Sequence, residues 1–295
     1  MGWFLVLTAP VARGLSDHEI ATIAGVLGPE ILGQGGSPPR RLGAAAAEIA
    51  CDHRPDLGAL RAVCPGIDIN SVPAQQRRKR ILIADMDSTI IPVECIDEIA
   101  DFAGVKPQVA EITERAMAGE LDFEEALRAR LALIAGLPEQ ALERVFAERI
   151  RLNPGARVLV RTMAANGAHT ALVSGGFTFF TGRVAAAAGF AEHRANRLVF
   201  EGGVLSGGIA EPILGRAAKL EALTEIAGKL RVGTEAALAV GDGANDISMV
   251  EAAGLGVAYH AKPALEAKAD AVIRYADLAA LLHLQGYSED EFCRD

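Results

Sequence analysis

Residues 81–89 read Ile81-Leu82-Ile83-Ala84-Asp85-Met86-Asp87-Ser88-Thr89, four apolar residues that run into an Asp-x-Asp-x-Thr turn. The apolar run predicts a buried strand. Side chains two residues apart on an extended segment point the same way, so Asp85 and Asp87 are expected to face one site. Buried charge is unfavourable unless it is paired or binds a metal. The two carboxylates could form a metal-binding pair, or a nucleophile with an acid/base partner, or only an Asp-rich turn.

Two further predicted strands also end in polar residues. Residues 170–173 are followed by Ser174-Gly175-Gly176, and residues 236–240 by Gly241-Asp242-Gly243-Ala244-Asn245-Asp246. Strands and helices alternate from residue 154 to the end of the chain, which together with residues 81–84 predicts an α/β fold with a doubly wound, Rossmann-like parallel sheet. Ligands of such sheets bind at the carboxyl ends of the strands. The three polar clusters are therefore expected to meet at one edge.

This set of residues suits phosphoryl transfer. Three carboxylates without histidine or thiol ligands favour a hard cation, and Mg2+ fits best. Ser174 could present its hydroxyl and nearby backbone N–H groups to an anion, or could simply begin a helix. Asp85 would attack phosphorus as a covalent nucleophile, while Asp87 would protonate the leaving oxygen and then activate water. Mg2+, Ser174 and Lys219 would hold the phosphoryl oxygens, although a lone helix lysine is usually a solvated surface residue.

The chain does not return directly to the sheet after Thr89. Helices predicted at 93–102, 107–117, 122–136 and 138–148 form an inserted cap, residues 92–150.

The cap contains an arginine and an acid that suit an amino-acid ligand. Phe123, Leu127 and Arg130 share one helix face, which the two apolar residues mark as buried. A guanidinium there needs an anionic partner, and a carboxylate suits it, although an arginine that extends to solvent is the alternative. Glu94 could read an ammonium group or only favour the helix dipole. Together they match a zwitterionic amino acid.

Residues 1–75 are predicted to form a small α+β domain. Strands at 3–8, 30–32, 44–51 and 67–72 and helices from Ser16 and at 56–63 give the order βαββαβ of a ferredoxin-like sandwich. The domain carries no chemical motif and could be a regulatory small-molecule domain or a dimerisation surface. Residues 73–80 read as a polar linker, and the basic residues 77–80 as a solvated part of it.

The composition limits the classes of partner that the protein is expected to bind and indicates its cellular compartment. The chain has 295 residues, 51% of them apolar, and a net charge of −9, which argues against nucleic acid as a main partner. No apolar run reaches the ~20 residues that span a bilayer, and the N-terminus lacks the basic start of a signal peptide. The four scattered cysteines predict reduced thiols, and with them a cytoplasmic protein. A homodimer is compatible with all of this.

The motifs resemble those of the haloacid dehalogenase-like phosphatases, and most closely the phosphoserine phosphatases among them. The matching residues are Asp85-Met86-Asp87-Ser88-Thr89, Val173-Ser174-Gly175-Gly176-Phe177, Lys219 and Gly241-Asp242-Gly243-Ala244-Asn245-Asp246. Supporting stretches lie at 116–123, 127–130, 195–198 and 241–249. The resemblance covers residues 80–285, which predicts a phosphatase core domain at residues 76–295. Residues 1–75 resemble, less closely, the ACT-like extension of bacterial members.

The resemblance implies a role for each matching residue. Asp85 matches the nucleophile and Asp87 the proton donor, with Mg2+ held by the Asp85 carboxylate, the Asp87 carbonyl and the Asp242 carboxylate. Asp246 matches a support behind these ligands. The implied phosphate- and substrate-binding residues are Ser174, the Gly175 amide, Lys219, Asn245, Met117, Phe123, Glu94 and Arg130.

The implied activity is Mg2+-dependent hydrolysis of O-phosphoserine to serine and phosphate through an aspartyl phosphate, the last step of serine biosynthesis. A related hydrolase or phosphotransferase for another small phosphomonoester is one alternative. A non-catalytic amino-acid-binding regulatory protein is another, although it would not need both a nucleophile and an acid.

Overall fold

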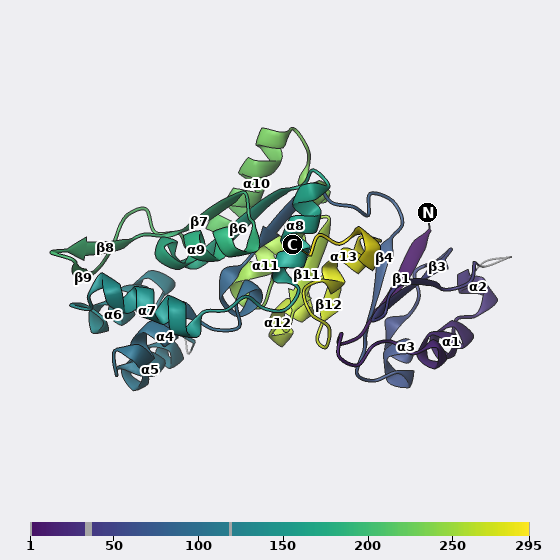
Figure 1. The fold of residues 1–295 in the computed structure, drawn as a ribbon, viewed down its shortest axis with the longest axis horizontal. Coiled ribbons are helices and arrows are strands. Elements are labelled where there is room, and N and C mark those ends of the chain that lie inside the picture. The colour runs from purple at the N-terminus through teal and green to yellow at the C-terminus, as the bar shows by residue number, and fades with distance from the viewer. Residues whose placement is uncertain (1, 33–36, 118–119, 295) are drawn as a thin grey trace.

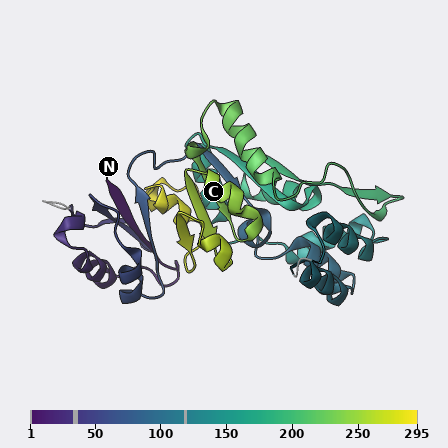
Figure 2. The ribbon, with the colours of Figure 1, turned by 180° about the vertical axis from the view of Figure 1, so that it is seen from behind.

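A computed structural model describes residues 2–32, 37–117 and 120–294 of the chain. The molecule is elongated, with a central parallel sheet, a smaller N-terminal sheet at one end and a group of cap helices at the other (Figure 1). The view from behind shows the same order of the three parts (Figure 2). The cap and the N-terminal sheet therefore lie on opposite sides of the central sheet.

The central sheet has six strands in the order β12-β11-β10-β5-β6-β7, and every neighbouring pair is parallel. Its strands are β5 (Ile81–Ala84), β6 (His169–Phe177), β7 (Glu192–Asn196), β10 (Ala237–Gly241), β11 (Leu255–Tyr259) and β12 (Ala271–Ile273). The predicted doubly wound sheet is confirmed. Because all strands run the same way, their carboxyl ends share one edge. Strand β7 was not predicted, since its residues are largely polar.

Alternation along β5 explains why helices cover both faces of this sheet. Leu82 and Ala84 pack on one side among residues of α8 (Ala156–Ala165), α9 (Thr178–Ala188) and α13 (Ala280–Leu284). Ile81 and Ile83 pack on the other side among residues of α10 (Ala218–Leu230), α11 (Ile247–Ala252) and α12 (Pro263–Glu266). None of the helices within the described ranges has the length and apolar character needed to cross a membrane.

The insertion after β5 begins with a five-residue turn, Met86–Ile90, and continues as four helices. They are α4 (Cys95–Phe102), α5 (Lys106–Met117), α6 (Phe123–Leu133) and α7 (Glu139–Arg149). The hairpin β8 (Leu198–Glu201) and β9 (Val204–Ile209) belongs to the later chain but lies against this cap. Leu205 accepts a hydrogen bond from Gly136 N and donates one to Leu137 O, both at 2.8 Å. The cap is thus attached through the hairpin as well as through its own two ends.

The N-terminal sheet has the antiparallel order β2-β3-β1-β4 of a ferredoxin-like sandwich. Its elements are β1 (Trp3–Thr8), α1 (Asp17–Val26), α2 (Pro29–Leu32), β2 (Arg40–Gly43), β3 (Ala46–Cys51), α3 (Leu57–Val63) and β4 (Asp68–Pro73). The Ser16–Glu19 capping box is present. The predicted strand at 30–32 is wrong: these residues lie in the short helix α2, and the second strand comes later, as β2.

The prediction that residues 77–80 form a solvated linker is wrong for Arg77. Its side chain is only 10% exposed, and Nη1 lies 2.7 Å from Glu48 Oε2 on β3. The guanidinium also donates to the carbonyls of His283 and Leu284 and stacks 4.2 Å from the Phe4 ring. These partners come from both ends of the chain, so Arg77 joins the N-terminal sheet to the part of the chain that contains the central sheet.

A second contact joins the edge strand β4 to the edge strand β12. The side-chain amide of Asn70 donates to Val272 O at 3.0 Å and accepts from Val272 N at 2.9 Å. Two residues earlier, the Asp68 carboxylate accepts hydrogen bonds from the backbone N–H groups of residues 274–276. The N-terminal domain is therefore docked through buried polar groups with specific partners.

Candidate active site

A cavity of about 550 Å³ opens between the carboxyl edge of the catalytic sheet and the cap. All three predicted strand ends contribute to it. The predicted site residues that line it are Asp85, Asp87, Ser174, Gly175, Lys219, Asp242 and Asn245 from the core, and Glu94, Phe123, Leu127 and Arg130 from the cap. Asp246 is fully buried beside it. The side chain of Met117 lies outside the described part of the structure.

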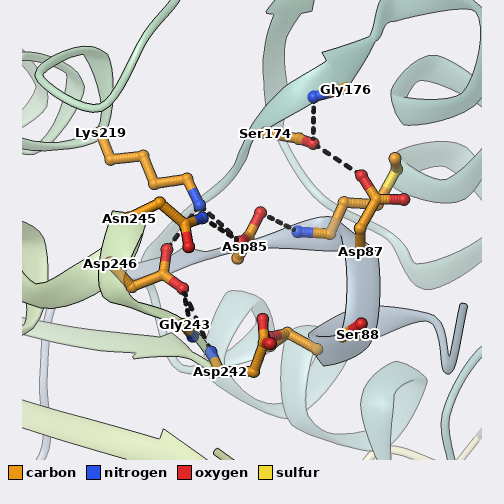
Figure 3. A network of polar contacts seen from close by, with 12 residues as sticks. Asp85, Asp87, Ser88, Ser174, Gly176, Lys219, Asp242, Gly243, Asn245 and Asp246 are labelled. Carbon is orange, nitrogen blue, oxygen red and sulfur yellow. Dashed lines mark hydrogen bonds and ion pairs between the residues drawn. The ribbon is translucent and has the colours of Figure 1, made fainter. Parts of the chain in front are cut away.

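Asp85 follows β5 directly and is held by its neighbours in the sheet (Figure 3). Its backbone N–H donates to Val240 O at 3.0 Å, which continues the pairing of β5 with β10. One carboxylate oxygen, Oδ1, accepts from Met86 N at 2.7 Å, and the other, Oδ2, accepts from Asn245 Nδ2 at 3.1 Å. Asp85 is only 4% exposed, so its carboxylate has a fixed direction toward the cavity.

Lys219 lies between two of the carboxylates and is not the solvated helix residue that a lone lysine usually is. Its Nζ is 2.5 Å from both Asp85 Oδ2 and Asp246 Oδ1, and the residue is 3% exposed. Burial by itself lowers the pKa of Lys219, but the charges of Asp85 and Asp246 outweigh it and raise that pKa. The other Asp246 oxygen accepts the N–H groups of Asp242 and Gly243 at 3.1 Å. Asp246 thus positions both the lysine and the loop after β10.

Asp87 has a different environment from Asp85. Its Oδ1 accepts from Cys95 N at 2.9 Å, and its Oδ2 accepts from the Ser174 hydroxyl at 3.1 Å. Burial, and then the charges of Glu94 and Asp85, raise the pKa of Asp87 to about 7. A carboxyl group with such a pKa can carry a proton near neutral pH, as a general acid must.

The acidic cluster fits a hard divalent cation. Carboxylate oxygens of Asp85, Asp242 and Asp246 lie within 4.8 Å of one another. Both carboxylate oxygens of Asp246 already accept hydrogen bonds, from Lys219 and from the backbone. Among the described residues, the carboxylate of Asp242 has only a long contact of 3.4 Å, from Thr89 Oγ1. Burial, and then the charges of Asp85 and Glu94, raise the pKa of Asp242 to about 6. An all-oxygen set with excess negative charge is what Mg2+ prefers.

The cap brings an acid and an arginine to the same cavity. Glu94 precedes α4 and accepts from the Ser88 hydroxyl at 2.7 Å. Arg130 donates through Nε to Ala126 O at 3.2 Å. Burial lowers the pKa of Arg130, while the charges of Asp97 and Glu94 act in the opposite direction.

The predicted buried face of α6 is only partly correct. Leu127 is 3% exposed, but Phe123 is 42% exposed. The Phe123 ring lies over the cavity, with Cζ 3.6 Å from where a Cβ on Gly175 would stand. Phe123 is therefore an apolar cover of the strand end rather than part of the core.

Four further polar residues of the cavity were missed in the sequence: Asp97, Thr113, Arg216 and Lys262. Asp97 lies in the first turn of α4, three residues after Glu94 at the start of the helix, so the helical period could have found it. Lys262 follows β11, and its backbone N–H donates to Asp242 O at 2.8 Å. The parallel topology places this fourth strand end beside the other three, but a single exposed lysine gave no signal of its own.

A sequence model of the haloacid dehalogenase-like hydrolases matches residues 82–251. The chain is 44% identical over 230 residues to a phosphoserine phosphatase of Albidiferax ferrireducens, an alignment that covers 76% of this chain and 97% of that protein. The alignments with two longer phosphoserine phosphatases cover only 63% and 57% of the length of those proteins.

Solved structures show the same fold. A HAD family hydrolase from Salmonella enterica serovar Typhi superposes with a TM-score of 0.82 at 31% identity, over 99% of this chain and 100% of that chain. A substrate-bound phosphoserine phosphatase complex superposes with a TM-score of 0.65 at 40% identity, over 70% of this chain and 97% of that one. The second alignment therefore leaves 30% of this chain unmatched.

Proposed function

The chain belongs to the haloacid dehalogenase-like hydrolases, and from this membership we propose that it is a phosphoserine phosphatase. It hydrolyses O-phosphoserine to serine and phosphate, the last step of serine biosynthesis. The observation that carries the proposal is the placement of Asp85 beside Lys219 and Asn245, in one cavity with Asp87 and with the cap residues Glu94 and Arg130. The choice of O-phosphoserine as the substrate rests on the relatives, which are phosphoserine phosphatases.

Asp85 acts as the nucleophile. Lys219 and Asn245 hold its Oδ2 and Met86 N holds its Oδ1, so the carboxylate is oriented before the substrate arrives. An Asp85 oxygen forms a bond to phosphorus as the bond to the serine oxygen breaks. Asp87 gives its proton to that oxygen, and serine leaves. Asp87 then takes a proton from water, which attacks phosphorus, releases phosphate and restores the Asp85 carboxylate.

The phosphoryl oxygens are held by the Ser174 hydroxyl, the Gly175 N–H and the Lys219 ammonium group. The carboxylates of Asp85 and Asp242 and the carbonyl of Asp87 would hold Mg2+, which supplies positive charge to the phosphoryl group when bound. Donors that are fixed before the reaction stabilise the charge that spreads in the transition state. Asp246 keeps Lys219 and the loop after β10 in position.

The cap selects the amino-acid part of the substrate. Glu94 accepts the ammonium group, and Arg130 donates to the carboxylate in a charge-assisted pair. Phe123 covers the cavity above Gly175 and excludes water. Met117 completes the proposed substrate-binding set.

The test is phosphate release by purified protein with Mg2+ from a panel of O-phosphoserine, O-phosphothreonine, sugar phosphates and nucleotides. O-phosphoserine should give the highest kcat/KM, and chelation of Mg2+ by EDTA should stop release reversibly. A preference for sugar phosphates would point to a related phosphomonoesterase. Serine binding without any phosphate release would point to a regulatory protein and would overturn the proposal.

A further inference from the structure

Asn196, the last residue of β7, joins two parts of the active site that are far apart in the sequence. It is 1% exposed. Its Nδ2 donates to Gly175 O at 2.8 Å and to Leu214 O at 3.2 Å, and its Oδ1 accepts from Leu214 N at 2.7 Å. One side-chain amide thus connects the end of β6 with the segment that leads into α10.

On the β6 side, Asn196 fixes a peptide plane next to the phosphate site. The carbonyl of Gly175 accepts from Asn196, and the N–H of the same peptide unit, that of Gly176, donates to Ser174 Oγ at 2.9 Å. Because a peptide unit is planar, bonds at both ends fix its orientation. Ser174 Oγ then donates to Asp87 Oδ2 at 3.1 Å. A continuous chain of hydrogen bonds therefore runs from Asn196 to the proposed proton donor.

The space around this peptide unit is small, so its position matters. A Cβ on Gly176 would stand 2.8 Å from Asp87 Oδ2 and 3.1 Å from Ser174 Oγ. The backbone approaches these two side chains as closely as a glycine permits. A shift of the peptide plane would move the hydroxyl that holds the phosphoryl group relative to the group that supplies the proton.

On the other side, Asn196 holds both backbone polar groups of Leu214. Helix α10 begins four residues later at Ala218, and its second residue is Lys219. The intervening Gly215 lies beneath Phe123, with a built Cβ 3.8 Å from the ring. The same amide that fixes the Gly175 peptide also fixes the entry of the chain into the helix that carries the lysine.

We propose that Asn196 is a positioning residue of the phosphoryl site. Without touching the substrate, it sets the spacing between the Ser174–Gly175 cradle and Lys219, the groups that hold the phosphoryl oxygens in the proposed function. The proposal rests on the proposed function, since it concerns the same cavity. The cap residues that recognise the amino acid are outside this hydrogen-bond chain, so Asn196 should affect phosphate binding and leave serine binding unchanged.

The test is Asn196→Asp, which keeps the shape of the side chain and replaces the Nδ2 donor with an oxygen that faces two carbonyls. The expected kcat is about 10- to 100-fold lower, because small misplacements of preorganised donors have effects of this size. The inhibition constant of inorganic phosphate should rise about tenfold, which corresponds to 1.4 kcal/mol. The inhibition constant of L-serine should stay within a factor of about two.

The two inhibition constants separate positioning from a loss of folded protein. A smaller folded fraction lowers kcat but leaves both inhibition constants unchanged. Asn70→Asp is the matched control, because Asn70 is equally buried and holds both backbone groups of Val272, away from the cavity. It should lower the unfolding temperature and leave all three constants unchanged. If Asn196→Asp does not fold, Asn196→Ser takes its place.

An unchanged phosphate constant in a folded Asn196 variant would overturn the inference. A parallel rise of the serine constant would overturn it as well, because it would indicate a general disturbance of the cavity. A wild-type protein that does not hydrolyse O-phosphoserine overturns the proposed function instead. In that case, the affinities of wild type and Asn196→Asp for inorganic phosphate, measured by calorimetry in the presence of Mg2+, still test the role of Asn196.

Discussion

The ammonium group of Lys219 lies 2.5 Å from the carboxylate of Asp85, and both side chains are almost completely buried. The same nitrogen is 2.5 Å from Asp246. Charges taken out of water are tolerated only when each has an opposite partner with good geometry. Lys219 therefore supports the folded state of the site as well as its proposed chemistry, and the two contributions can be measured separately.

Asp85→Asn should abolish turnover while the fold is kept. The amide has nearly the same shape but cannot form the phosphoryl-enzyme intermediate, so kcat should fall by about a thousandfold or more. The measurement is phosphate release from O-phosphoserine, with circular dichroism as the check of folding. Turnover close to that of wild type would exclude Asp85 as the nucleophile.

Lys219→Met should destabilise the protein most when divalent cations are absent. It leaves Asp85 and Asp246 buried without their cation, at a cost of about 3–5 kcal/mol. Millimolar Mg2+ should restore part of the unfolding temperature, because an ion that binds only the folded state stabilises it. Lys229→Met is the control. Lys229 is exposed and pairs with Glu225 on the surface, so its loss should leave the unfolding temperature unchanged. Equal melting of Lys219→Met and wild type would contradict this account.

Arg130→Ala should weaken the binding of O-phosphoserine selectively. The loss of a charge-assisted pair with the substrate carboxylate should raise KM by about 10- to 100-fold. Hydrolysis of p-nitrophenyl phosphate, which has no such carboxylate, should change little. Arg128→Ala is the matched control, because Arg128 is on the same helix but pairs with Glu211 at the surface. If both variants alter both substrates alike, Arg130 has no part in selection.

Glu48→Gln should loosen the attachment of the N-terminal domain without altering catalysis. Glu48 is 4% exposed, and the change leaves the nearly buried guanidinium of Arg77 without its charge partner. Loss of one member of a buried pair costs about 3–5 kcal/mol, which urea unfolding can measure. Arg78→Ala is the control, since the Arg78–Glu291 pair is largely exposed and should contribute little. A fall in kcat/KM would mean that the domain contact also acts on the active site.

The buried His283 should make stability depend on pH below neutrality. It is 5% exposed, and its Nδ1 donates to Tyr287 O at 3.0 Å. Burial lowers the pKa of His283 from its usual 6.5, so the unfolded chain takes up the proton at a higher pH than the folded one. The contribution is fully present above pH 6.5 and is lost as the pH falls from there toward the folded pKa.

The measurement is the free energy of unfolding in urea between pH 7.5 and 5.5. His283→Gln should reduce the slope with pH, by at most about 1.4 kcal/mol per pH unit, the limit for one group. His18→Gln, which removes an exposed histidine of α1, is the control variant. An unchanged slope in His283→Gln would show that other groups control the acid response.

The strand ends of the active site were predictable from sequence, whereas the polar edges of the sheets were not. Asp85, Ser174 and Asp242 each follow an apolar run, and parallel strands bring their carboxyl ends together. Strands β2 and β7 are edge strands of their sheets, and their many charged and polar residues hide the apolar alternation on which strand prediction depends. The functional roles of the converging residues stay predictions.

Buried polar residues were the other feature that could not be predicted from the sequence. A run of basic residues predicts solvation, and Arg77 departs from it only because Glu48 and the carbonyls of His283 and Leu284 surround it in the fold. Asn196 likewise has no local signal, since its partners lie 18 and 21 residues away. Phe123 shows the opposite case, an apolar residue on a helical stripe that covers a cavity.

The pairing of Asn70 with Val272 also protects the edge strand β12 from pairing with a strand of another chain. An unpaired edge strand is a template on which another chain can add a strand, and this leads to aggregation. At β12 the amide of Asn70 occupies the N–H and the C=O of Val272, as a neighbouring strand would. A shortened protein that lacks residues 1–75 would expose this edge. To stay monodisperse, it would need a lysine or proline placed there to repel incoming strands.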